Sequence, residues 1–93
     1  MKYYVIEWEG VDVDEPFRIY IEVDRTGRIC RKAEFYHAGF GQYYEEELPE
    51  EPVNLAELIG EGTCEELPRP FFESAVAQVY ELSGGLTGMD FGF

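Results

Sequence analysis

The residue types that most often carry catalysis are scarce in this chain of 93 residues. His37 is the only histidine, and Cys30 and Cys64 lack the C-x-x-C spacing of a redox or zinc site. Ser74 and Ser83 lack the glycine pattern of a nucleophile elbow, and no phosphate-binding glycine loop or H-E-x-x-H motif occurs. We interpret His37 as a turn residue. No enzymatic activity, catalytic residue or cofactor is predicted.

One short acidic segment offers oxygen ligands for a hard cation such as calcium. Asp12, Asp14 and Glu15 form the run D-V-D-E. The glycine and the terminal bidentate glutamate of a calcium loop are missing at the proper offsets. We therefore favour a solvated loop and predict no metal site, and a carboxylate metal-binding protein is the less favoured alternative.

Glutamate is the dominant chemical feature, and the formal net charge is −13. Residues 1–44 hold eight acidic and six basic side chains, whereas residues 45–93 hold twelve acidic side chains and only Arg69 as a base. Such a field repels nucleic acids and anionic membranes and attracts basic proteins. A hydrated surface that only improves solubility is the plainer interpretation. The predicted contact residues are the acidic side chains of this half and two tyrosines expected to be exposed: Glu45, Glu46, Glu47, Glu50, Glu51, Glu61, Glu65, Glu66, Tyr43 and Tyr44.

The elements that position these residues begin with four predicted strands. Period-2 patterns and turn residues place them at 2–9, 17–24, 28–36 and 40–45. In the second, Phe17, Ile19, Ile21 and Val23 share one face. The segment 24–27 (DRTG) predicts a hairpin turn. Arg31 falls on the apolar face of the third strand and requires a carboxylate or carbonyl partner if buried.

Two helices are predicted after the acidic, proline-containing connection 46–52. Asn54 fits the N-cap of a short helix, with Glu57 three residues later, and glycines at 60 and 62 end it. Pro70 fits the first position of a longer helix that reaches about Leu82 and carries an apolar stripe.

These elements predict an α+β fold. We expect a four-stranded, mainly antiparallel sheet (a meander) with one short and one longer C-terminal helix packed on one face. The length predicts a single domain, 1–93, divided into a β-meander (1–45), an acidic loop with helices (46–83) and a Gly-rich tail (84–93) whose order is left open. Because no 18-residue apolar run occurs and Glu7 and Glu9 interrupt the N-terminal segment, we expect a cytoplasmic protein without a membrane partner.

The order of these features resembles a known family. The run DEPFRIYIEVDRTGRICRKAEFY, the acidic stretch with proline, the LAELI helix and the helix begun by PFFESAV resemble a family of small bacterial proteins of unknown function. That family is similar in setting to the immunity proteins of polymorphic toxin systems. The resemblance covers residues 2–82, is most specific from Asp14 to Glu34, and excludes the C-terminal LTGMDFGF. It implies no catalytic residues.

Charge and resemblance together predict an acidic protein-binding inhibitor, similar to an immunity protein or antitoxin. Its expected partner is a basic protein, such as a nuclease-type toxin or another nucleic-acid-binding enzyme, and direct binding of nucleic acid is not expected. The alternative is a structural or homo-oligomeric interaction module that uses the apolar sheet face or the tail. The sequence leaves monomer and homodimer open.

Overall fold

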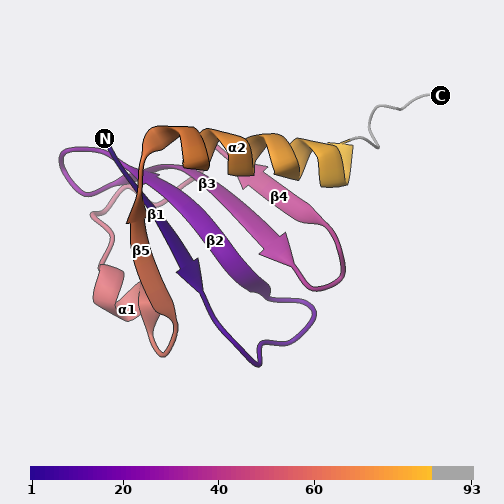
Figure 1. Ribbon diagram of the computed structural model, residues 1–93. Helices are drawn as coiled ribbons and strands as arrows, with labels where there is room; N and C mark the ends of the chain where they lie inside the picture. The colour runs from indigo at the N-terminus through magenta and orange to yellow at the C-terminus, as the bar shows by residue number, and fades with distance from the viewer. Residues whose placement is uncertain (85–93) are drawn as a thin grey trace.

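Five strands form one antiparallel sheet in the computed structural model, which describes residues 1–84 (Figure 1). The strand order is β4-β3-β2-β1-β5, so β4 and β5 are the edge strands. The strands are β1 (Lys2–Glu7), β2 (Pro16–Val23), β3 (Ile29–Tyr36), β4 (Gly41–Tyr44) and β5 (Thr63–Leu67). The helices are α1 (Leu55–Ile59) and α2 (Arg69–Val79), and α2 continues as a π-helical turn, Tyr80–Gly84.

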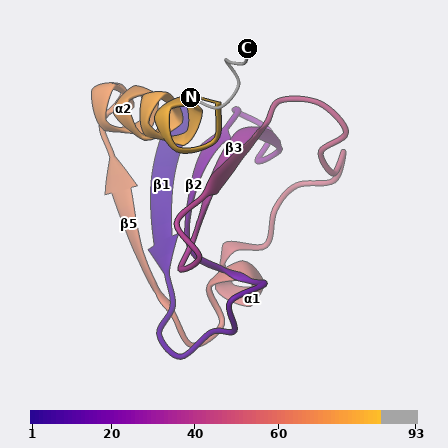
Figure 2. The same cartoon turned by 90° about the vertical axis from the view of Figure 1, so that its right-hand side faces the viewer.

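Both faces of the sheet are covered. On the α2 face, side chains from β1, β2 and β3 pack against the helix: Tyr3, Tyr20, Ala33 and Phe35 meet Phe72, Ala75, Val76 and Val79. On the α1 face, a second cluster packs against α1 and the segment that leads into it: Ile6, Ile19, Ile21 and Val23 meet Val53, Leu55, Leu58 and Ile59. Figure 2 shows α1 well apart from α2. The core therefore has two layers with the sheet between them.

The prediction that both helices pack on one face is wrong. Along β2, Ile19 and Ile21 point to the α1 face, while Tyr20 between them points to the α2 face. The sequence pattern treats the Tyr20 side as solvent-facing because Arg18 and Glu22 share it. Tyr20 pairs with Ala33 across the strands, and this tyrosine and alanine belong to an apolar surface that α2 covers. Ala33 and Phe35 thus lie on the face opposite to Ile19 and Ile21.

The predicted α+β fold is confirmed, and the antiparallel meander of four strands is present as β1 to β4. The sheet has a fifth strand that was not predicted, because the region 46–83 contains β5 in addition to the acidic loop and helices. β5 pairs antiparallel with β1, from Tyr3 opposite Leu67 to Glu7 opposite Thr63. Its burial pattern is exposed at four of five positions. An edge strand of this kind has no alternating apolar signal, since neither of its faces is deeply buried.

Several local predictions are confirmed. Asp24 Oδ1 accepts hydrogen bonds from the backbone N–H groups of Thr26 (2.9 Å) and Arg28 (3.0 Å), and Gly27 has a φ of 91° in this turn. Asn54 caps α1, because its Oδ1 accepts from the Glu57 N–H at 3.1 Å.

The predicted tail, 84–93, lies outside the described residues except for Gly84, which ends the π-helical turn. Among residues 1–84, no helix is long and apolar enough to cross a membrane.

Candidate partner-binding surface

The glutamates predicted to contact a partner lie in two groups. The first, here called the acidic loop, follows β4 and consists of Glu45, Glu46, Glu47, Glu50 and Glu51. The second, here called the β5-edge glutamates, consists of Glu61 in the turn before β5 and Glu65 and Glu66 within it. All eight side chains are exposed. Because β4 and β5 are opposite edges of the sheet, the two groups do not form one continuous patch.

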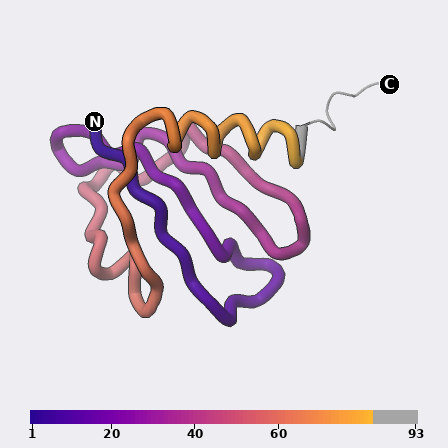
Figure 3. The backbone as a smooth tube through the Cα atoms, viewed as in Figure 1, coloured from indigo at the N-terminus to yellow at the C-terminus, as the bar shows by residue number. Residues whose placement is uncertain are grey.

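The backbone path explains this separation. From β4 the acidic loop runs back to the β2–β3 turn, where the Val53 N–H donates to the Gly27 carbonyl at 2.7 Å. The chain then crosses the α1 face as α1 and turns at residues 60–62 into β5 (Figure 3). The connection 45–62 thus moves the chain from one edge of the sheet to the other.

The two tyrosines predicted as exposed anchors are half-buried and point to opposite faces of β4. Tyr43 packs against the α2-face cluster, its ring centroid 5.7 Å from that of Tyr80, and its hydroxyl donates to Glu45 at 3.1 Å. Burial raises the pKa of Tyr43. Tyr44 has the Lys32 ammonium 4.9 Å from its ring centroid and donates to Gln42. Both rings are engaged in contacts within the chain.

Four cations form the salt bridges of the described residues, and none of these bridges involves either acidic group. Glu7, Glu22, Glu34 and Glu73 supply every carboxylate in the salt bridges of the described residues, and their partners are Arg18, Arg31, Lys32 and Arg69. Nine exposed glutamates between residues 45 and 66, namely the two groups and Glu57, take no part in these ion pairs. Their charge is therefore available to a partner.

Arg31 has the carboxylate partners that its position on an apolar face requires. Its Nε and Nη2 each donate to Glu22 at 2.9 Å, and Nη2 donates to Glu73 of α2 at 2.7 Å. The guanidinium holds the pKa of Glu22 and of Glu73 below the usual range. It also lies 4.9 Å from the Phe72 ring centroid. This cluster fastens α2 to the sheet and leaves no free charge for a partner.

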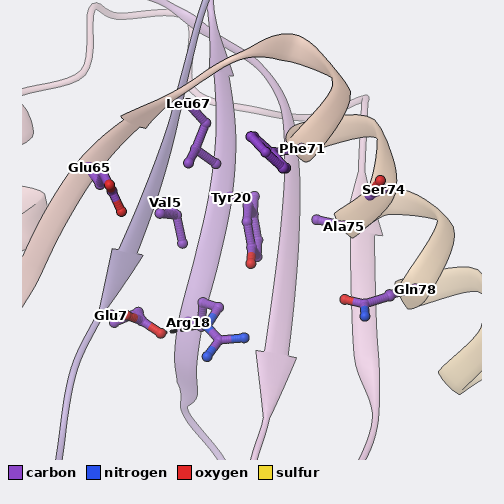
Figure 4. Close-up of a pocket in the computed structure, with 10 residues that line it drawn as sticks. All are labelled: Val5, Glu7, Arg18, Tyr20, Glu65, Leu67, Phe71, Ser74, Ala75 and Gln78. Atoms are coloured by element: carbon purple, nitrogen blue, oxygen red, sulfur yellow. Dashed lines mark hydrogen bonds and ion pairs between the residues drawn. The ribbon is translucent and has the colours of Figure 1, made fainter.

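A groove of about 520 Å³ lies between α2 and the strands β1, β2 and β5 (Figure 4). Val5, Leu67 and Phe71 form its apolar upper part together with Tyr20, and Phe71 is 60% exposed. At its lower end Arg18 Nε donates to Glu7 at 2.7 Å. Glu65 lies on the β5 side, and Ser74, Ala75 and Gln78 come from α2. An exposed apolar centre with carboxylates at its border is typical of a protein-binding surface.

Groups suited to catalysis or metal binding are not assembled in the described residues. The His37 ring stacks on Phe17 with centroids 4.3 Å apart, and no hydrogen bond found in residues 1–84 joins this histidine to a serine or cysteine. Across the same residues, no three His, Cys, Asp or Glu side chains are grouped as metal ligands. Asp12, Asp14 and Glu15 are exposed side chains of the loop between β1 and β2.

The cysteines lie on β3 and β5, which are separated by two strands. Burial raises the thiol pKa of Cys30 and of Cys64. Three interstrand spacings amount to about 14 Å, beyond the reach of a disulfide. Both thiols are free in this structure.

Sequence reasoning missed the groove. Val5 falls within the strand predicted at 2–9, but the sequence pattern assigns no contact to Leu67 or to Phe71, whose neighbour Phe72 is the buried residue of the two. The one local signal was the adjacent pair Phe71-Phe72, because two successive helical positions cannot both face the sheet.

Protein-family models, curated proteins and solved structures were each compared with the chain, and none of the three comparisons gives a match.

Proposed function

We propose that this protein acts by binding a basic protein partner and inhibiting it, in the manner of an immunity protein or antitoxin. The observation that carries the proposal is the set of nine exposed glutamates between residues 45 and 66 that the chain's own cations leave unpaired. Like charges held together on a surface destabilise a fold, and binding of a cationic partner offsets that cost. A cationic, substrate-binding cleft on a partner supplies the opposite charge.

The two acidic groups have different roles in this proposal. Of the β5-edge glutamates, Glu65 lines the groove with its exposed Phe71, so this side combines an apolar centre with a carboxylate at its border. Glu61 and Glu66 lie beside it, in the turn before β5 and within β5. We assign the docked contact to this side. The acidic loop lies at the opposite edge of the sheet and contributes long-range attraction.

Self-association is the competing interaction. Each sheet face is already covered by a helix layer, which removes the apolar sheet face as a contact. Pairing two copies through β5 brings Glu65 and Glu66 close to their counterparts, and like charges opposed across strands are destabilising. We therefore propose a monomer. A concentration-dependent dimer in light scattering would contradict this part.

The test begins with capture from a lysate of the source organism and continues with the purified partner. Three forms are compared: the intact protein, a loop variant and an edge variant. The loop variant replaces the five acidic-loop glutamates by glutamine, and the edge variant carries Glu61→Gln, Glu65→Gln and Glu66→Gln. The captured protein is then assayed for its own activity with and without the intact chain.

The two variants have different expected effects. The association rate constant of the intact protein falls about tenfold as NaCl rises from about 50 to about 500 mM, and the loop variant loses much of this dependence. The edge variant mainly dissociates faster, because its charges border the contact. Salt-independent association, or a captured partner whose activity is unchanged by saturating protein, would reject the proposal.

A further inference from the structure

A second cavity lies where β1 ends and β5 begins, below the groove. Its volume is about 570 Å³, and Glu7 and Thr63, which pair across the two strands, lie on its wall. Its lining combines three carboxylates, two aromatic rings and no cation: Glu7, Trp8, Glu9, Phe17, Glu61, Gly62 and Thr63. This composition is that of a site for a positively charged group.

The indole of Trp8 is held rigidly at this cavity. Its Nε1 donates to the Ile59 carbonyl at 2.7 Å, at the end of α1. Gly62 lies against the ring so closely that a Cβ at this position would be 2.5 Å from Trp8 Cδ1. A ring fixed by a hydrogen bond and by backbone contact loses little conformational freedom on binding a ligand.

The other aromatic ring is already occupied. Phe17 stacks on His37, and the Arg18 guanidinium lies 5.3 Å from the Phe17 ring centroid. The chain thus places one of its own guanidinium groups near an aromatic ring beside this cavity. Trp8 is the other ring in the cavity lining, and none of the cation–ring contacts of the described residues involves it.

Of the three carboxylates at the cavity, one is already paired with a cation of the chain. Glu7 Oε2 accepts from Arg18 Nε at 2.7 Å, which neutralises much of its charge. Glu9 and Glu61 are exposed and take no part in the salt bridges of the described residues. No three acidic or other ligating side chains within residues 1–84 converge as they would on a metal ion. The separated carboxylates and the indole suit an organic cation instead.

We propose that this cavity binds an arginine side chain of the partner protein. A guanidinium can stack on an indole face while its in-plane N–H groups donate to carboxylates, which a compact ammonium cannot do. A free arginine has a zwitterionic backbone whose carboxylate the acidic surface repels, whereas an arginine within a protein presents the guanidinium as its only charge. This inference rests on the proposed function only for the source of the side chain, because the cation site itself follows from Trp8, Glu9 and Glu61.

The single tryptophan makes the test direct, because the intrinsic fluorescence of the full chain then reports this cavity. The probe is the neutral-ended tripeptide acetyl-Ala-Arg-Ala-amide, and the citrulline peptide of the same shape is its uncharged control. We expect a saturable change in Trp8 emission with a dissociation constant of about a millimolar for the arginine peptide. The citrulline peptide should bind at least tenfold more weakly, because the loss of one charge-assisted contact raises the dissociation constant about tenfold.

Two double variants separate the cavity from the general field. Glu9→Gln with Glu61→Gln should weaken peptide binding about tenfold, whereas Glu45→Gln with Glu46→Gln removes the same charge elsewhere and should change it less than about twofold. Equal losses in both variants, or equal binding of the citrulline peptide, would overturn the cation site. Free arginine that binds as tightly as the peptide would overturn the assignment to a protein side chain.

Peptide binding at the cavity and inhibition of the partner can fail independently of each other. Peptide binding that persists while no captured partner is inhibited would refute the proposed function and support the cavity. Salt-dependent inhibition with no peptide response at Trp8 would refute the cavity and support the function.

Discussion

Arg31 joins α2 to the sheet through carboxylates on both elements. Two carboxylates, Glu22 from β2 and Glu73 from α2, accept hydrogen bonds from its guanidinium. Glu22 is 7% exposed, so it is not stabilised by water if its cation is removed. Replacing Arg31 alone therefore leaves the buried Glu22 carboxylate without its cation.

Replacing Arg31 by methionine should lower the free energy of unfolding by about 3 kcal/mol at about pH 7, because a buried carboxylate is left unpaired. In the intact protein the depressed pKa of Glu22 and Glu73 stabilises the fold above the unfolded-state pKa, and this stabilisation is lost as the pH falls through the folded-state value. The variant lacks it, so the difference between the two proteins should shrink towards about pH 4. Urea unfolding at both pH values measures this.

Arg69→Met is the matched control for that experiment. Arg69 also contacts Glu73, at 3.3 Å, but its side chain is 69% exposed, so its loss should change the free energy of unfolding by less than about 0.5 kcal/mol. A loss for Arg31→Met that is the same at both pH values would mean that its packing on Phe72 matters more than its charge.

Gly62 is constrained by its neighbours and not by its φ angle. A Cβ here would collide with the Glu7 carbonyl oxygen and lie 2.5 Å from Trp8 Cδ1. We expect Gly62→Ala to lower the free energy of unfolding by about 1–3 kcal/mol and to shift Trp8 emission. The adjacent Glu61→Ala should change stability by less than about 0.5 kcal/mol. An unaffected Gly62→Ala variant in thermal unfolding would show that the turn relaxes easily.

At the scale of the elements, the strands with a buried face were predictable and the edge strand was not. β1 to β4 were found because apolar residues such as Ile19 and Ile21 alternate with polar ones along them. β5 has Leu67 as its only partly buried residue, and it is held by backbone pairing with β1, which leaves no mark on side-chain pattern. The groove and the cavity lined by Trp8 both adjoin β5, so they could not be predicted without that strand.

The helix positions were predictable from capping residues, but their sides of the sheet were not. Asn54 and Pro70 mark the starts of α1 and α2 through local chemistry. Which face each helix covers depends on the path of the connection and on apolar area contributed by several strands together. One face of β2 carries Tyr20 between Arg18 and Glu22, and the sequence of this strand alone does not show whether that face is buried.

Two adjacent phenylalanines of α2 test its orientation directly. Phe72 is 0% exposed in the α2-face core, whereas Phe71 is 60% exposed at the groove. Phe72→Ala should lower the free energy of unfolding by about 3–5 kcal/mol, and Phe71→Ala by less than about 0.5 kcal/mol. Urea unfolding followed by Trp8 fluorescence measures both. Similar losses at the two positions would contradict the assigned face of α2.

At the scale of the whole molecule, the charges that form salt bridges and the exposed glutamates from 45 to 66 are different residues. Within residues 1–84, four cations join strands and α2 through salt bridges, and none of these bridges involves an exposed glutamate from 45 to 66. The mutual repulsion of these glutamates opposes the folded state, in which they are held closer than in the unfolded chain. A charge arrangement that weakens the fold is a sign that the surface is retained for another purpose.

Salt should therefore stabilise this protein. Raising NaCl from about 50 to about 500 mM shortens the screening length from above 10 Å to a few ångströms, which weakens repulsion among exposed charges more than the partly buried Arg31 pairs. We expect the midpoint of thermal unfolding to rise by a few degrees. The five-glutamine loop variant should begin with a higher midpoint and respond less to salt. A midpoint that falls with salt in both proteins would show that ion pairs outweigh repulsion. A loop variant that is more stable than the intact protein but associates more slowly with the partner would show that the acidic loop is kept for binding at the expense of stability.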